Sequence, residues 1–189
     1  MLKKKFTEIL LVLSFLLQLS NTKADTKEKI IENINNIETL KFDFIQTSFD
    51  KNEDGVCFLK RPHFLKCLYN DKNGKQLIIN RKTLVIFHKK YNKVYYYPVS
   101  KSYFLEILNR NNFTDLVTQG ILTSKEDIWE IKYYDEKKGK IIFYFDSETL
   151  NLSGWNVSDT NNNNTLLKMK NLKKNEIINN KFFSIPLKN

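Results

Sequence analysis

The sequence predicts a mainly β protein of roughly eleven short antiparallel strands and two helices. Apolar and polar residues alternate over many short runs, and turn residues recur about every ten positions between residues 41 and 97. The connections there are too short to hold the crossover helices of a parallel sheet. With 189 residues, 41% of them hydrophobic, the chain is long enough for one core and short for two.

The first 24 residues are typical of a secretory signal peptide, because three lysines precede an apolar run over residues 9–19 and small residues end the segment at Ala24. The run is shorter than the roughly 20 residues that cross a bilayer, although an uncleaved anchor helix is the alternative. Asp25, rather than Cys, follows, so a lipoprotein anchor is excluded. We therefore expect residues 1–24 to be removed and residues 25–189 to form one soluble domain in the periplasm.

Residues 26–38 predict an amphipathic helix, with isoleucines spaced to form one apolar face. Strands follow up to residue 97, with turns at Asn52–Gly55, Arg61–His63 and Asp71–Gly74. Ser102–Asn109 predicts a short helix with a very apolar face, which Phe113–Val117 extends. The predicted strands are 41–46, 56–60, 64–69, 76–79, 84–87, 94–97, 128–134, 141–145, 152–157, 166–172 and 182–185.

The sequence does not favour catalysis or a metal site. It has no glycine-rich phosphate loop, no G-x-S-x-G motif and no H-E-x-x-H motif. The two cysteines and the two histidines, His63 and His88, match no zinc-site spacing, and both cysteines lie in apolar strand patterns. We therefore expect no enzyme activity, metal or cofactor.

The formal charge is +10, but the lysines are spread along the chain instead of forming one stripe. We therefore expect no nucleic-acid partner. Several strands are apolar on both faces, as in Leu84–Phe87 and Ile141–Phe145. Two interpretations remain open: a filled sandwich core with one face covered by the helices, or a strongly curved sheet that lines a cavity beneath a helical lid.

Several short motifs follow one another in a fixed order. They are Phe44–Gln46 after the first helix, Gly55, Lys60-Arg61-Pro62, the hairpin Leu77–Leu84, a Pro and a Leu/Phe-rich helix after Val94, and Asn175–Pro186. In this order they resemble the LolA family of periplasmic lipoprotein carriers, over essentially the whole chain after residue 24. Asn80-Arg81 departs from the family's usual Asp-Gly, and the cysteines are not family features.

The resemblance implies an incomplete, strongly curved antiparallel β-barrel closed by a lid of short α-helices. Its apolar cavity would accept the acyl chains of lipoproteins released by an inner-membrane ABC complex, and pass them to an outer-membrane receptor or to the outer membrane itself. We expect a monomer. The alternative is a non-catalytic periplasmic β-domain with a filled core that acts as an envelope interaction protein.

The resemblance also assigns roles to residues. Arg61 would hold the lid closed through hydrogen bonds to lid carbonyl groups, which suits the five donors of a guanidinium; a solvated surface arginine is the alternative. The cavity and lid would use the helix residues Ile34, Ile37, Phe104, Ile107 and Leu108 and the strand residues Phe44, Leu84 and Ile86. The choice of strand face stays open, because a slip of one residue reverses it.

Cys57 and Cys67 flank the turn at Arg61–His63 symmetrically. In a tight antiparallel hairpin they would lie opposite each other, within reach of a disulfide, and the expected compartment is oxidising. Two free thiols that face the core are the alternative, because a bulge at Pro62 would turn the side chains to opposite faces.

Overall fold

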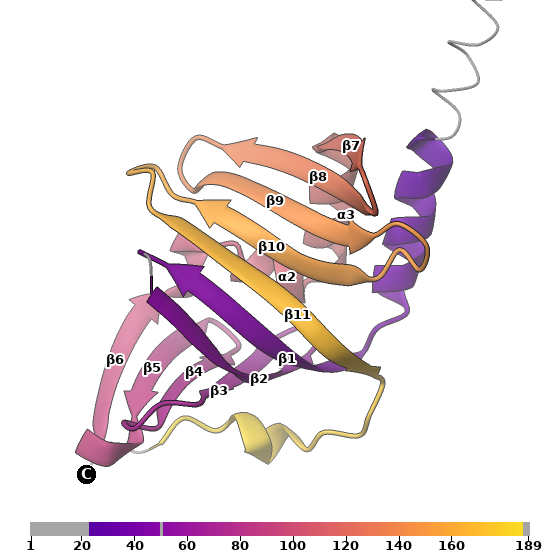
Figure 1. Ribbon diagram of the computed structural model, residues 1–189. Helices are drawn as coiled ribbons and strands as arrows, with labels where there is room; N and C mark the ends of the chain where they lie inside the picture. The colour runs from indigo at the N-terminus through magenta and orange to yellow at the C-terminus, as the bar shows by residue number, and fades with distance from the viewer. Residues whose placement is uncertain (1–22, 50, 187–189) are drawn as a thin grey trace, which may run out of the picture.

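The computed structural model describes residues 23–49 and 51–186, so the predicted signal peptide lies almost entirely outside the described residues (Figure 1). The described chain contains eleven strands in one antiparallel sheet, with short helices on one side. The strands are β1 (Thr39–Ser48), β2 (Lys51–Lys60), β3 (Phe64–Tyr69), β4 (Lys75–Asn80), β5 (Thr83–His88), β6 (Lys93–Pro98), β7 (Ile121–Lys125), β8 (Ile128–Asp135), β9 (Gly139–Asp146), β10 (Leu152–Ser158) and β11 (Asn164–Lys174).

The helices are an N-terminal helix over residues 23–35, α2 (Phe104–Leu108) and α3 (Arg110–Gln119). The described chain also has three short 3-10 helices: η1 (Lys89–Tyr91) between β5 and β6, η2 (Val99–Lys101) between β6 and α2, and η3 (Asn180–Phe183) after β11. Among the described helices, none has the length and apolar character needed to cross a bilayer.

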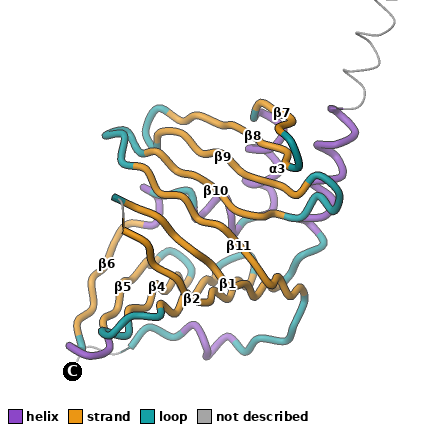
Figure 2. Tube along the Cα trace, in the orientation of Figure 1, coloured by secondary structure: helices purple, strands orange, loops and turns teal. Residues whose placement is uncertain are grey.

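The strand order is β6-β5-β4-β3-β2-β1-β11-β10-β9-β8-β7, so β6 and β7 are the two edges and the sheet is not closed into a barrel. Strands that are consecutive in the sequence pair with each other, except for β6 and β7, and β1 also pairs with β11 at the centre. The chain must therefore cross from one edge of the sheet to the other between β6 and β7. It crosses through α2 and α3, which places these helices over one face of the curved sheet (Figures 1 and 2).

The main core lies between the sheet and the helices. Strand residues with period-two spacing face it, such as Phe42 on β1 and Phe143 and Phe145 on β9, all of them at most 1% exposed. Ile30 of the N-terminal helix and Phe113 of α3 meet them from the other side. We call this the concave face, and the three helices over it the helical cover.

A second, smaller cluster explains why some strands are apolar on both faces. Ile78, Val85 and Phe87 point away from the helical cover and pack with Ile185, which belongs to the C-terminal segment. That segment runs back across the outer face of β2–β4, where the ring of Phe182 meets Phe58. The outer face of this half of the sheet is therefore covered by the chain's own C-terminus.

The predicted fold class is confirmed, but one predicted strand is wrong. Residues 182–185 do not form a strand: η3 ends there, and its carbonyl groups accept hydrogen bonds from the side chains of Lys66 and Asn80 rather than from a β ladder. The eleventh strand is β7, which sequence patterning missed because it is short and mostly exposed.

Two further local predictions are wrong. The predicted turn Asn52–Gly55 lies inside β2, and the hairpin turns near Phe49 instead. Gly55 is needed for close strand approach, because a Cβ there would lie 2.0 Å from the carbonyl oxygen of Leu68. Phe113–Val117 belongs to a separate helix, α3, because Asn109 is extended and its side chain accepts a hydrogen bond from the amide of Asn112.

Candidate functional site: the concave face and its helical cover

The structure brings most of the predicted lid and cavity residues into one core. Six of them are buried there: Ile34, Ile37, Phe44, Leu84, Ile107 and Leu108. Phe104 is partly buried against the same core. Ile86 is half-buried and outside the core cluster, although it shares the concave face with Leu77, its directly opposite partner on β4.

Arg61 follows β2 and begins the turn into β3, directly beneath the helical cover. Its Nη1 donates to the carbonyl oxygen of Ile34 at 3.0 Å, and its Nη2 donates to that of Ile107 at 3.1 Å. One guanidinium thus joins the N-terminal helix and α2 to the sheet. Ile34 and Ile107 lie close to the C-terminal ends of their helices, where carbonyl groups lack helical partners and a cation is favoured.

Burial of the charged Arg61 guanidinium costs free energy and also limits the groups that the guanidinium can contact. Arg61 is 8% exposed, and burial, aided by repulsion from Arg110, lowers its pKa to about 10. The side chain therefore remains charged at neutral pH. The ring of Phe113 lies 6.0 Å from the guanidinium carbon, and Nε has no partner within the described chain. The charge is thus stabilised by helix carbonyls, by an aromatic face and, at longer range, by the Glu38 carboxylate.

Two other cations hold the helical cover, and sequence reasoning missed both. Lys27 of the N-terminal helix donates to the carbonyl oxygens of Thr118 and Gly120, at 2.8 and 2.7 Å, at the C-terminal end of α3. Arg110, at the start of α3, is paired with Glu38 at 2.5 Å. Lys27 therefore fastens the start of the N-terminal helix to the end of α3, and Arg110 fastens the start of α3 to the segment between that helix and β1.

A different set of contacts fastens α2 to the β8–β9 hairpin. The hydroxyl of Tyr103 donates to the carbonyl oxygen of Gly139 at 2.6 Å in a buried setting. Glu106 and Lys138 form an ion pair beside it, and the Lys138 ammonium lies 5.6 Å from the centre of the Tyr103 ring. Burial, with a contribution from Asp135, raises the pKa of Tyr103 above its usual value.

A cavity of about 350 Å³ opens beside α2, between the helical cover and the sheet. Phe104 and Ile107 line it from α2, and Trp155, Val157 and Leu167 line it from β10 and β11. Its walls are mostly apolar, so two residues predicted from sequence to belong to the lid do border an apolar space. Elsewhere on the concave face, side chains of the cover fill the volume above the sheet.

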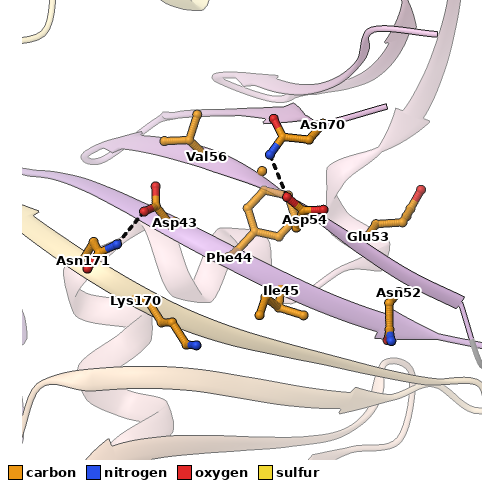
Figure 3. Close-up of a pocket in the computed structure, with 11 residues that line it drawn as sticks. Asp43, Phe44, Ile45, Asn52, Glu53, Asp54, Val56, Asn70, Lys170 and Asn171 are labelled. Atoms are coloured by element: carbon orange, nitrogen blue, oxygen red, sulfur yellow. Dashed lines mark hydrogen bonds between the residues drawn. The ribbon is translucent and has the colours of Figure 1, made fainter. Parts of the chain in front are cut away.

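The outer face carries a more polar pocket of about 640 Å³, shown in Figure 3. Its acidic groups are already bonded to neighbours: Asp43 accepts from Asn171 at 2.7 Å, and Asp54 accepts from Asn70 at 2.6 Å (Figure 3). Within the described residues, no three His, Cys, Asp or Glu side chains are placed to hold a metal ion. The concave face is therefore the stronger candidate site.

The β2–β3 hairpin that presents Arg61 also carries the two cysteines. Cys57 and Cys67 lie directly opposite each other, with Cα atoms 4.0 Å apart, and are joined by a disulfide. The register shows no bulge at Pro62, so both side chains face the concave core. The crosslink ties together the two strands on either side of the Arg61 turn.

The comparisons with known proteins agree with this geometry. Residues 35–186 match the family described as "Outer membrane lipoprotein carrier protein LolA". The chain belongs to the LolA family. No curated protein matches it.

Two solved structures with TM-scores above 0.5 share this fold at low sequence identity. An uncharacterised conserved protein from Thermus thermophilus has 10% identity and a TM-score of 0.54, and the match covers 87% of this chain and 94% of that one. A DUF1329 family protein from Desulfovibrio piger has 9% identity and a TM-score of 0.51, with 85% and 96% covered. A LolA superfamily protein from Nitrosomonas europaea has 10% identity and a TM-score of 0.44, with 84% and 97% covered.

Proposed function

We propose that the protein is a periplasmic carrier that binds the acyl chains of lipoproteins on its concave face and conveys them from the inner to the outer membrane. The observation that carries this proposal is the double hydrogen bond from Arg61 to two separate helices of the cover. Such a clamp suits a cover that must open for a cargo and close again after its release. Membership of the LolA family supports the same role.

The size of the cavity implies that binding requires movement. About 350 Å³ is at the lower end of pockets that hold drug-sized ligands. Several acyl chains would need the space that Ile34, Leu108 and Phe113 now fill. We therefore infer that this packing is the closed form, in which the cover fills its own binding site.

Release must be coupled to a partner, because each methylene group that is buried contributes about 0.8 kcal/mol. The proposed partners are an inner-membrane ABC complex that loads the carrier, and an outer-membrane receptor or the outer membrane itself, which accepts the cargo. The role is binding rather than catalysis, and no cofactor is part of it.

The alternative is an envelope interaction protein with a permanently filled core. The observation that favours it is the dense packing of large side chains such as Phe42, Phe113 and Phe143, each at most 1% exposed. In that case the helical cover would never leave the sheet, and no lipid would enter.

Native mass spectrometry of the protein recovered from the periplasm distinguishes the two. A carrier co-purifies with lipoprotein or lipid. If the wild-type protein remains free of lipid when lipoproteins are overproduced, the filled-core alternative is correct.

A further inference from the structure

One edge of the sheet presents an unusual group of tyrosines. Four of the nine tyrosines in the chain lie within residues 91–97, on η1 and β6. Tyr91, Tyr95, Tyr96 and Tyr97 are all between 44% and 57% exposed. Because β6 is an edge strand, the strand has no neighbour on its outer side within the described sheet (Figure 1).

Cations stand at both ends of this row of tyrosines. Lys89, Lys90 and Lys93 lie at the start of β6 and in the turn before it, and all three are exposed. At the far end, Thr83 pairs with Pro98, so the exposed turn Arg81–Lys82 lies beside the end of β6. We call Tyr91–Tyr97, with these flanking cations, the tyrosine edge.

The charged side chains in the part of the sequence around the tyrosine edge are all basic. From Lys72 to Leu105 the chain carries seven lysines and one arginine and no acidic residue. None of the five cations of the tyrosine edge forms an ion pair within the described chain, whereas Lys75 on β4 is paired with Glu53. The uncompensated positive charge therefore gathers at the sheet edge that carries the exposed aromatic rings.

We propose that the tyrosine edge docks on the surface of a lipid bilayer that carries anionic headgroups. Tyrosine is enriched at the boundary between membrane and water, because its ring is apolar and its hydroxyl is polar. Lysine and arginine side chains next to such rings are attracted to anionic headgroups, and their long aliphatic parts let the charged groups extend beyond the rings to the headgroups. Rings in the middle with cations at both ends are the arrangement that a flat anionic interface favours.

Charge argues against the other occupant of an exposed edge strand, a second copy of this chain. Two tyrosine edges brought side by side would place lysines near lysines and no acid near either. Pro98 also removes a backbone donor at the end of β6 that an added strand would need. A bilayer demands neither backbone pairing nor matched opposite charges on a partner chain.

Docking at this edge would bring the helical cover to the membrane. The chain passes from β6 through η2 directly into α2, whose Phe104 and Ile107 line the cavity. If the protein carries acyl chains as proposed above, cargo would then enter or leave close to the lipid surface. The docking itself does not depend on cargo, so it can be tested without any lipoprotein.

The test is cosedimentation with vesicles. The protein is exported to the periplasm of a bacterial host and recovered from there, so that all variants are processed alike. Vesicles of phosphatidylcholine alone are compared with vesicles that also contain phosphatidylglycerol. We expect binding only to the anionic vesicles and a loss of binding as salt is raised.

Two variants map the surface. Exchange of Lys89, Lys90 and Lys93 for glutamine should weaken binding by tenfold or more, since each lysine near an anionic surface contributes about fivefold. The matched control exchanges Lys168, Lys170 and Lys173, which are exposed on β11, for glutamine and alters the net charge equally. It should change binding less than about threefold. Tyr95→Thr with Tyr96→Thr, at unchanged net charge, should also weaken binding several-fold.

The outcomes separate clearly. If the two triple-lysine variants lose vesicle binding equally, net charge rather than this edge attracts the protein to the membrane, and the proposal is overturned. So would the absence of binding to anionic vesicles. A concentration-dependent dimer in sedimentation analysis that the tyrosine variant abolishes, without vesicle binding, would assign the edge to a second copy. Failure of the carrier function with intact vesicle binding would leave this inference standing.

Discussion

Arg61 and Ile107 are separated by 46 positions in the chain, yet Nη2 of the arginine donates to the carbonyl oxygen of the isoleucine at 3.1 Å. The bond joins the turn between β2 and β3 to α2, and the other terminal nitrogen of the same guanidinium reaches the N-terminal helix. Opening of the cover at this point therefore requires that two bonds to one buried cation break together.

Exchange of Arg61 for leucine should leave cargo binding intact and slow its release. Hydrogen bonds from a charged donor contribute about 1.5–3 kcal/mol each, and loss of one such bond shifts an equilibrium about tenfold or more. The open, loaded form is then relatively favoured. We expect transfer of a labelled lipoprotein to acceptor membranes to fall about tenfold.

Arg61→Lys is the matched variant, because it keeps the charge but cannot reach two carbonyl groups in the same way. It should transfer cargo at a rate between those of the wild type and Arg61→Leu. Unchanged transfer by the leucine variant would remove Arg61 from the mechanism.

A photo-crosslinking residue at Phe104 should capture lipoprotein in living cells. Phe104 borders the cavity beside α2 and is partly buried, so an acyl chain that enters there would touch it. Lys168 on β11 is the control, because it is exposed and outside this cavity. Adducts confined to the control position would show that α2 is not part of the lid.

The disulfide between Cys57 and Cys67 should protect both thiols in protein isolated without reductant. Intact-mass measurement after alkylation is then expected to find no added label, and complete labelling of both residues would contradict the bond. Replacement of both cysteines by alanine should lower the free energy of unfolding by about 2–3 kcal/mol, given their separation of 10 residues.

Tyr103→Phe should destabilise the fold by about 1–2 kcal/mol, because it leaves the buried carbonyl oxygen of Gly139 without its donor. Urea unfolding measures the change. Tyr134→Phe is the control: Tyr134 is 65% exposed, and its loss should alter stability by less than about 0.5 kcal/mol. Equal effects would mean that the Tyr103 bond does not hold α2.

The same tyrosine should make stability depend on pH in the alkaline range. Its pKa is raised in the folded state, chiefly by burial, so the folded protein keeps a proton that the unfolded chain releases near pH 10. The contribution is complete below that pH and is lost as the pH rises further. Stability measured from about pH 9 to pH 11 should therefore fall less steeply in Tyr103→Phe than in the wild type.

The sequence alone determined the class of the fold and much of the candidate site. Alternation in some runs, and short apolar runs bounded by turn residues in others, located ten of the eleven strands, since a half-buried strand repeats every two residues and a strand buried on both faces is apolar throughout. The order of the motifs predicted the family, and the resemblance to that family predicted that Arg61 lies near the lid. The equal spacing of the cysteines about Pro62 predicted their opposition, because a tight hairpin fixes which residues face each other.

Only the tertiary structure decided what covers each face of the sheet. The apolar run Phe182–Ile185 looks like a strand, but its rings pack on the outer face of β2–β4 and its backbone bonds to lysine and asparagine side chains. The contacts that Lys27 and Arg110 make could likewise not be predicted from the sequence, because their partners lie more than 70 positions away in the chain. The local periodicity of the sequence indicates which residues are buried, but the path of the whole chain determines which residues they pack against.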